Sequence, residues 1–111
     1  MPKTSDITIR VKLNEDSVPE TIQWSADSSG GEMENCEAFM LGIWDAKNAE
    51  TLRIDLWTNE MRTDEMDKFM FQTFLTMADT YSRANQNEEM TKYIRDFAYM
   101  FGEKSGLIKR K

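Results

Sequence analysis

The sequence predicts an α+β domain in which a three-stranded antiparallel sheet carries three helices on one of its faces. Segments in which apolar and polar residues alternate fall mainly in the first half of the chain, as expected of half-buried strands. Apolar residues at helical spacing dominate the second half. Three strands alone are too few to fold without helices laid on one side. The expected order of elements is β-β-α-β-α-α.

Two strands are expected near the N-terminus. Residues 7–13 alternate strictly between apolar and polar side chains. The next residues, 14–19, carry turn chemistry that ends in Pro19, and alternation resumes over 20–25. We therefore predict that these two strands form a hairpin.

A helix is expected after an exposed loop. Residues 26–35 contain two glycines and several small polar residues, which favours a loop. Asn48 can adopt the left-handed conformation that ends a helix. The residues that recur at helical spacing between these points are Cys36, Phe39, Met40, Ile43 and Trp44. They predict a helix over about 34–47.

A third strand is expected over residues 50–58. Its apolar side chains are Leu52, Ile54 and Leu56, and the opposite side carries Arg53, Asp55 and Trp57. A crossover from the second strand through the helix is most simply read as placing this strand beside the first one. The predicted strand order is therefore 2-1-3, with the third strand antiparallel to the first.

A long helix is expected from Thr63, as its cap, to about Ala84. The acidic first turn suits the helix dipole. The side chains that share one core-facing stripe are Met66, Met70, Thr73, Phe74, Met77 and Tyr81. Phe71 and Leu75 point away from that stripe, so this helix needs a second neighbour, which is either the last helix or another chain.

The last helix is expected to begin at a capping box formed by Asn85 and Glu88. Gly106 should end it in the left-handed conformation, with Leu107 packing back on Phe101 in a Schellman arrangement. The residues after it form a short basic tail at about 106–111. We expect a single domain over residues 1–111, which is ordinary for this length.

Asp55 poses the main question about a site, because it interrupts an apolar run. The alternation places it on the polar side of the sheet, where it can pair across strands with Arg10 or Lys12. We therefore interpret Asp55 as a solvated structural residue rather than a catalytic one. Trp57 lies on the same polar side, where a large aromatic residue either packs under a loop or marks an interface.

The composition removes several classes of function. The chain has no histidine, one cysteine and no glycine-rich phosphate loop, so it lacks the usual groups for a catalytic triad, a thiolate zinc site or a nucleotide cradle. Acidic clusters lie near the expected helix starts, where structural carboxylates are common. A net charge of -6 disfavours nucleic acid. We expect no catalytic residues, metal or cofactor.

The location expected for the chain is the cytoplasm. A lone cysteine, Cys36, suits a reducing compartment, and its place on an apolar stripe favours a core role. The N-terminus lacks the apolar segment of a leader peptide, and the longest apolar run, at 38–44, is too short to cross a bilayer. We expect no membrane insertion.

Much of the chain resembles the GldC family of gliding-motility proteins. The segments that carry the resemblance are TSDITIRVKLNEDSVPETIQWSA at 4–26, LRIDLWTNEM at 52–61, DEMDKFMFQTFLTMADTYSRA at 64–84 and IRDFAYMF at 94–101. The resemblance implies a small, soluble, cytoplasmic protein of gliding bacteria of the Bacteroidetes type. It also implies association with a motility machinery that is coupled to type IX secretion. It brings no catalytic or binding residues with it.

Three hypotheses about function follow. The first is a non-enzymatic accessory protein that binds a protein partner through a free strand edge or through the open sheet side. The residues of that side are Trp57, Asp55, Arg53, Arg10 and Lys12. The second is a homodimer, formed through a strand edge or through Phe71 and Leu75 on the long helix. The third, an enzyme that uses paired carboxylates, needs two acids converging in a deep pocket.

Overall fold

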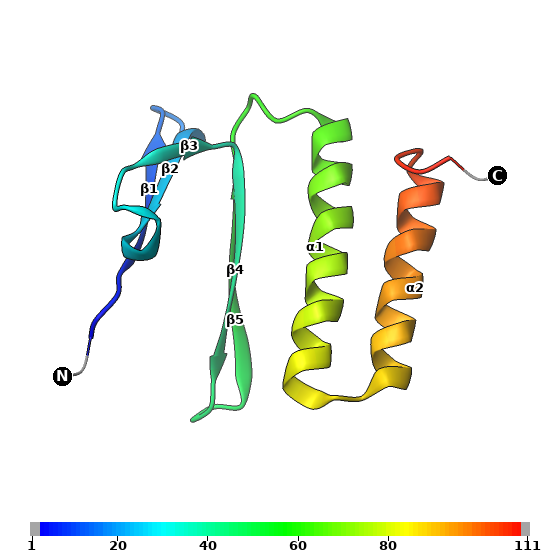
Figure 1. Cartoon of the computed structure of the whole chain (residues 1–111). Helices are drawn as coiled ribbons and strands as arrows, with labels where there is room; N and C mark the ends of the chain where they lie inside the picture. Colours follow the sequence, from blue (N-terminus) through cyan, green and yellow to red (C-terminus); the bar gives the residue numbers. More distant parts are fainter. Residues whose placement is uncertain (1–2, 110–111) are drawn as a thin grey trace. The chain divides into compact units, whose positions relative to one another are not determined.

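The computed structural model describes residues 3–109, which divide into two compact units. We call residues 1–61 the strand unit and residues 62–111 the helical unit. The strand unit holds five strands and a short 3-10 helix, and the helical unit holds two α-helices (Figure 1). The α+β class is confirmed. The prediction of three helices on one three-stranded sheet is wrong for the described residues.

The predicted N-terminal hairpin is confirmed. Strand β1 (Ile7–Leu13) pairs antiparallel with β2 (Pro19–Ala26). Ile9 lies opposite Trp24 and Val11 opposite Ile22, so one side of the hairpin is apolar, as the alternation requires. Ile22 is only 1% exposed and is the best-buried apolar side chain of the strand unit.

The turn between β1 and β2 is held by one side chain. Asn14 Oδ1 accepts hydrogen bonds from the backbone N–H of Asp16 at 2.8 Å and of Val18 at 3.1 Å. Ser17 takes a positive φ of 62° between them. These local bonds explain why the 14–19 segment turns the chain so tightly.

The segment after β2 is exposed, as predicted, and contains the 3-10 helix η1 (Asp27–Ser29). Gly30 ends that helix with a φ of 97°, a conformation that glycine adopts without strain. Strand β3 (Glu34–Cys36) then adds to β2 and completes a sheet in the order β1-β2-β3. Cys36 lies opposite Ile22 and extends the apolar side of this sheet.

The helix predicted over 34–47 is wrong. Residues 38–45 form strand β4 (Ala38–Asp45), which pairs antiparallel with β5 (Glu50–Trp57) in a separate two-stranded sheet. The apolar residues of this segment fit the spacing of a helix, but Phe39, Leu41 and Ile43 also alternate along one side of a strand. Aromatic and branched side chains fit the pleated surface of a strand well.

The predicted helix end at Asn48 is instead part of the turn between β4 and β5. Asp45 accepts hydrogen bonds from the backbone N–H of Lys47 at 3.1 Å and from the Asn48 side-chain amide at 2.8 Å. Ala49 follows with a positive φ of 54°. Together these residues close a hairpin rather than a helix.

The predicted strand order 2-1-3 is also wrong. In the structure β5 does not lie beside β1; it pairs with β4 of its own hairpin. The two differences are linked, because the neighbour of β5 is the 38–45 strand, for which the sequence predicts a helix. Since antiparallel strands need only a short connection, the local hairpin replaces the longer crossover.

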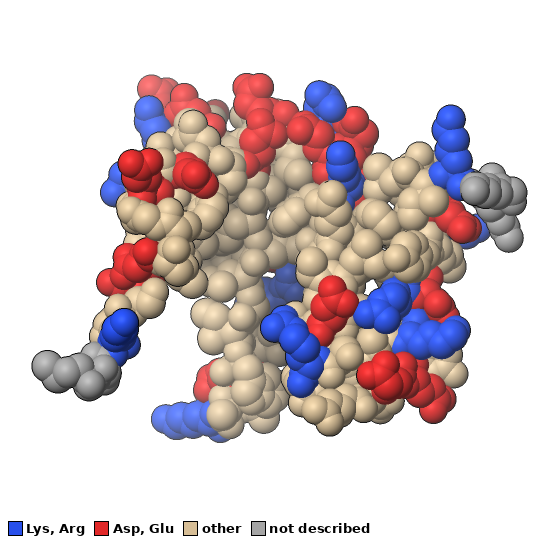
Figure 2. Space-filling model, viewed as in Figure 1, with Lys and Arg blue, Asp and Glu red and all other residues tan. Residues whose placement is uncertain are grey.

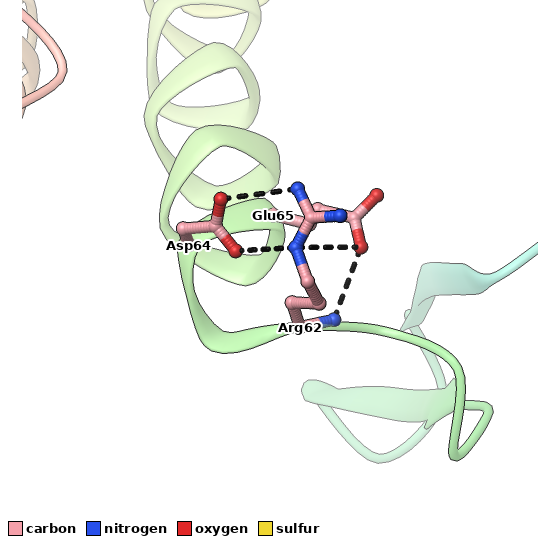
Figure 3. Close-up of polar contacts among 3 residues, drawn as sticks. All are labelled: Arg62, Asp64 and Glu65. Atoms are coloured by element: carbon pink, nitrogen blue, oxygen red, sulfur yellow. Dashed lines mark hydrogen bonds and ion pairs between the residues drawn. The ribbon is translucent and has the colours of Figure 1, made fainter.

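Helix α1 (Thr63–Asn85) confirms the long helix, but its cap is Arg62 rather than Thr63. The backbone N–H of Arg62 donates to Glu65 Oε1 at 3.1 Å, which is one half of a capping box. Arginine carries no acceptor for the other half. The Arg62 guanidinium instead donates to both carboxylate oxygens of Asp64, at 2.9 and 3.2 Å (Figure 3).

The cap of helix α2 (Glu88–Lys104) lies two residues after the predicted cap. Asn87 is the cap, and its side-chain oxygen accepts from Met90 N–H at 3.1 Å. The predicted cap, Asn85, is the last residue of α1 instead. The positive φ of Gln86, 54°, lets the chain turn between the two helices.

The predicted end of α2 is confirmed. Gly106 has a φ of 84°, and its N–H donates to Glu103 O at 3.1 Å, while Leu107 N–H donates to Gly102 O at 2.9 Å. This is the hydrogen-bond pattern of a Schellman motif. The predicted contact of Leu107 with Phe101 stays a prediction. Of the basic tail at about 106–111, Arg110 and Lys111 lie outside the described residues.

The two helices pack through aromatic rings. Phe74 makes edge-on contacts with Phe97 and Phe101, at centroid distances of 5.2 and 5.3 Å. Ala78 and Ala98 are fully buried, because small residues let the helices approach closely. The core of the helical unit therefore lies between α1 and α2.

Candidate functional site

Three of the predicted partner-surface residues share one side of β5. Arg53, Asp55 and Trp57 alternate with the apolar residues of the strand, and Trp44 of β4 lies on the same side, opposite Thr51. Trp44 is 64% exposed and Trp57 is 56% exposed. We call this side of the β4–β5 hairpin the tryptophan face.

Asp55 is exposed, as predicted, but its ionic partner differs from the prediction. Arg53 Nη2 donates to Asp55 Oδ1 at 3.0 Å, and both side chains remain partly in water. The expected pairing with Arg10 or Lys12 is wrong, because those residues lie on β1 in the other sheet. The misplaced strand order had put them beside Asp55.

A shallow pocket adjoins the tryptophan face. It measures about 260 Å³, and its walls come from the start of β2 and from the end of β5. The lining residues are Val18, Pro19, Asp55, Leu56, Trp57 and Asn59. Val18 and Pro19 are far from β5 in the sequence, and Asn59 lies just after its end. The alternation of side chains within β5 therefore could not predict that these three residues line the pocket. Trp57 lies beside the β1–β2 turn and yet keeps more than half of its surface exposed.

Phe71 and Leu75 belong to the helical unit, and both are half-buried. Phe71 contacts the ring of Tyr99 of α2 edge-on, at a centroid distance of 6.2 Å. A Cβ built on Gly102 of α2 would lie 2.8 Å from Phe71 Cε1. Phe71 therefore packs against α2, which was one of the two predicted neighbours. Phe74, from the predicted core-facing stripe, packs against α2 as well.

The charged residues of both units are spread among uncharged ones. In the space-filling view, uncharged surface separates the charged groups of the strand unit, and acidic and basic residues are interspersed on the helical unit (Figure 2). No helix among the described residues is long and apolar enough to span a membrane. Acidic residues predominate on the visible face of the strand unit (Figure 2).

Comparison with known proteins places the chain in a family. A family model described as gliding motility-associated protein GldC-like matches residues 19–107. The chain belongs to this GldC-like family. Neither curated proteins nor solved structures give a match. The match begins at Pro19. The tryptophan face and every lining residue of the pocket except Val18 therefore fall inside the family region of this GldC-like protein.

The acidic residues at the helix starts of the GldC-like chain lie in the first turns of α1 and α2. Asp64 and Glu65 hydrogen-bond to Arg62 at the start of α1 (Figure 3), and Glu88 and Glu89 lie in the first turn of α2. The Arg62 side chain lowers the pKa of Asp64 by hydrogen bonding to its ionised form. Within residues 3–109 no group of three or more His, Cys, Asp or Glu residues could hold a metal ion.

One acidic cluster of the GldC-like chain lies at a strand rather than at the predicted helix start. Glu32 and Glu37 flank the short strand β3 and Glu34 is its first residue, because the helix expected there does not form. Cys36, in the same strand, packs opposite Ile22. Burial raises the pKa of the Cys36 thiol, which opposes formation of a reactive thiolate and agrees with a core role.

Proposed function

We propose that this GldC-like chain is a non-enzymatic accessory protein of bacterial gliding motility, linked to type IX secretion, that works in the cytoplasm by binding another protein. The family match supports the association with gliding motility. The observation that supports protein binding is the tryptophan face, where Trp57 is 56% exposed beside a pocket. Tryptophan and arginine are enriched at the centres of protein interfaces.

The pocket favours an apolar anchor from the partner. Val18, Pro19 and Leu56 contribute apolar walls, and Trp57 contributes a large flat ring. Asp55 adds a carboxylate at the same pocket, although Arg53 already neutralises part of its charge. A partner side chain that enters here would bury aromatic area without leaving an unpaired charge.

The matched pair Trp57→Ala and Trp44→Ala tests the proposal. Both residues are exposed tryptophans on the same face, but only Trp57 lines the pocket. Each variant replaces the native chain in a gliding host, where spreading on agar is measured and captured proteins are identified by mass spectrometry. We expect Trp57→Ala to lose both motility and the captured components of the motility machinery, while Trp44→Ala retains both.

The result depends on an intact fold, which thermal unfolding measures. Because Trp57 is mostly exposed, its replacement should leave the unfolding temperature nearly unchanged. A variant that keeps its partners but melts far lower would show that Trp57 serves packing. Normal gliding by a fully folded Trp57→Ala variant would contradict the proposed site.

A further inference from the structure

The β4–β5 hairpin is incomplete as a sheet. Within residues 3–109 β5 is hydrogen-bonded to β4 alone, so its second edge is unpaired, although the start of β2 approaches the end of β5 at the pocket. A two-stranded sheet is at best marginally stable in water, and an unpaired edge presents free backbone donors and acceptors to another strand. Ile54, in the middle of β5, is 49% exposed on the apolar side.

The charges on β5 make this edge complementary to itself. Arg53 and Asp55 flank Ile54 and carry opposite charges on the same side of the strand. If β5 meets β5 of a second copy antiparallel about a twofold axis at Ile54, Arg53 of each copy lies opposite Asp55 of the other. Two cross-strand ion pairs then form, in addition to the pair that the structure contains within each strand.

The same charges disfavour the neighbouring registers. A shift of the axis to residue 53 places Arg53 opposite its own copy, and a shift to residue 55 places Asp55 opposite its own copy. A slip by one residue exchanges the two faces of one strand and sets apolar side chains against charged ones. Only the register centred on Ile54 satisfies the charges.

The apolar side also matches in that register. Leu52 lies opposite Leu56 of the second copy, and Ile54 lies opposite Ile54, so branched side chains form a continuous row across four strands. Strand β4 offers no comparable edge, because its central residue is Gly42 and its interior carries no charged pair. A central glycine weakens strand pairing.

We propose that two copies of this chain pair through β5, antiparallel and with Ile54 on the twofold axis, to form a four-stranded sheet in the order β4-β5-β5-β4. The proposal goes beyond the proposed function. The motility and capture results for Trp57→Ala do not depend on it, so either idea can fail alone.

Charge reversal tests the register directly. The variants Arg53→Asp and Asp55→Arg each place like charges opposite one another. Each should therefore raise the dissociation constant of the dimer about tenfold or more, measured by analytical ultracentrifugation. Mixing the two variants restores opposite charges across the axis, because one chain is then wholly acidic and the other wholly basic at these positions. The mixture should form a heterodimer, and the double variant R53D/D55R should form a homodimer again.

A crosslink checks the position of the axis. In a Cys36→Ser background, Ile54→Cys sits opposite itself and should form an intermolecular disulfide on mild oxidation, since paired side chains across a sheet lie close enough. Leu52→Cys is the matched control, because its opposite residue is Leu56. Far-UV circular dichroism verifies that every variant is folded.

Three outcomes would overturn the proposal. The native chain could sediment as a monomer at high micromolar concentration. The mixture of the two single variants could fail to associate while both are folded. The Leu52→Cys chain could crosslink as efficiently as the Ile54→Cys chain, which would place the contact in another register.

Discussion

Replacement of Gly102 by alanine would test how tightly the helical unit is packed. A Cβ at this position would lie 2.7 Å from Ile108 Cδ1, 2.8 Å from Phe71 Cε1 and 3.0 Å from Phe71 Cδ1. Real Cβ atoms do not approach other heavy atoms that closely, so at least one neighbour must move. Ile108 ends in a flexible side chain, whereas the Phe71 ring is held against Tyr99.

Two effects of opposite sign decide the result. Alanine in place of glycine inside a helix stabilises by up to about 1 kcal/mol, and overpacking costs about 1 to 3 kcal/mol. Gly102 lies in the last turn of α2, where the helix gain is smaller. We therefore expect Gly102→Ala to lower the free energy of unfolding by about 1 kcal/mol, which corresponds to about 4 to 8 °C in Tm for a domain of this size.

Thermal and urea unfolding followed by circular dichroism measure this change. Gly42→Ala is the control, since a Cβ at Gly42 meets nothing within 4 Å and should not lower Tm. The double variant Gly102→Ala with Ile108→Ala removes one of the clashing groups and should lose less than the sum of the two single changes. A Tm increase for Gly102→Ala alone would refute the packing argument.

Three further predictions concern single side chains. Asn87→Ala removes the cap of α2 and should lower the unfolding free energy by about 1 kcal/mol in urea titration, whereas Asn85→Ala should not. Thr58→Val should leave Tm unchanged or raise it, because Thr58 Oγ1 is buried and has no hydrogen-bond partner among the described residues. Arg62→Gln should raise the pKa of Asp64 toward its ordinary value in an NMR titration. The lowered pKa favours the folded state above the unfolded value of about 3.9, and that contribution disappears as pH falls through the folded pKa.

Local chemistry made part of the fold predictable. The β1–β2 hairpin, the extent of α1 and the Schellman end of α2 each depend on residues close together in sequence, such as the turn at Asn14 and the glycine at 106. The 38–45 segment was not predictable in this way. Its apolar residues fit both a helix and a strand, and pairing with β5 decided between them.

Only part of the candidate site was predictable from the sequence. Alternation along β5 correctly placed Asp55 and Trp57 on the side opposite Ile54. The pocket depends on how the β1–β2 turn approaches the end of β5, which no periodicity encodes. The association of Asp55 with Arg10 and Lys12 failed for a related reason, because it required a strand order that follows from tertiary pairing.

Strands β3 and β4 are separated by a single residue, Glu37, whose carbonyl accepts the Thr58 N–H at 2.9 Å. Cys36 on the apolar side of one sheet and Phe39 on the apolar side of the other differ by an odd number of positions, so a regular strand would point them in opposite directions. The chain bends at Glu37, so β3 and β4 do not continue as one regular strand. Natural insertions and deletions should therefore be rare at Glu37 and more frequent in the 27–33 and 46–49 loops. An added residue in those loops does not exchange the two faces of a strand.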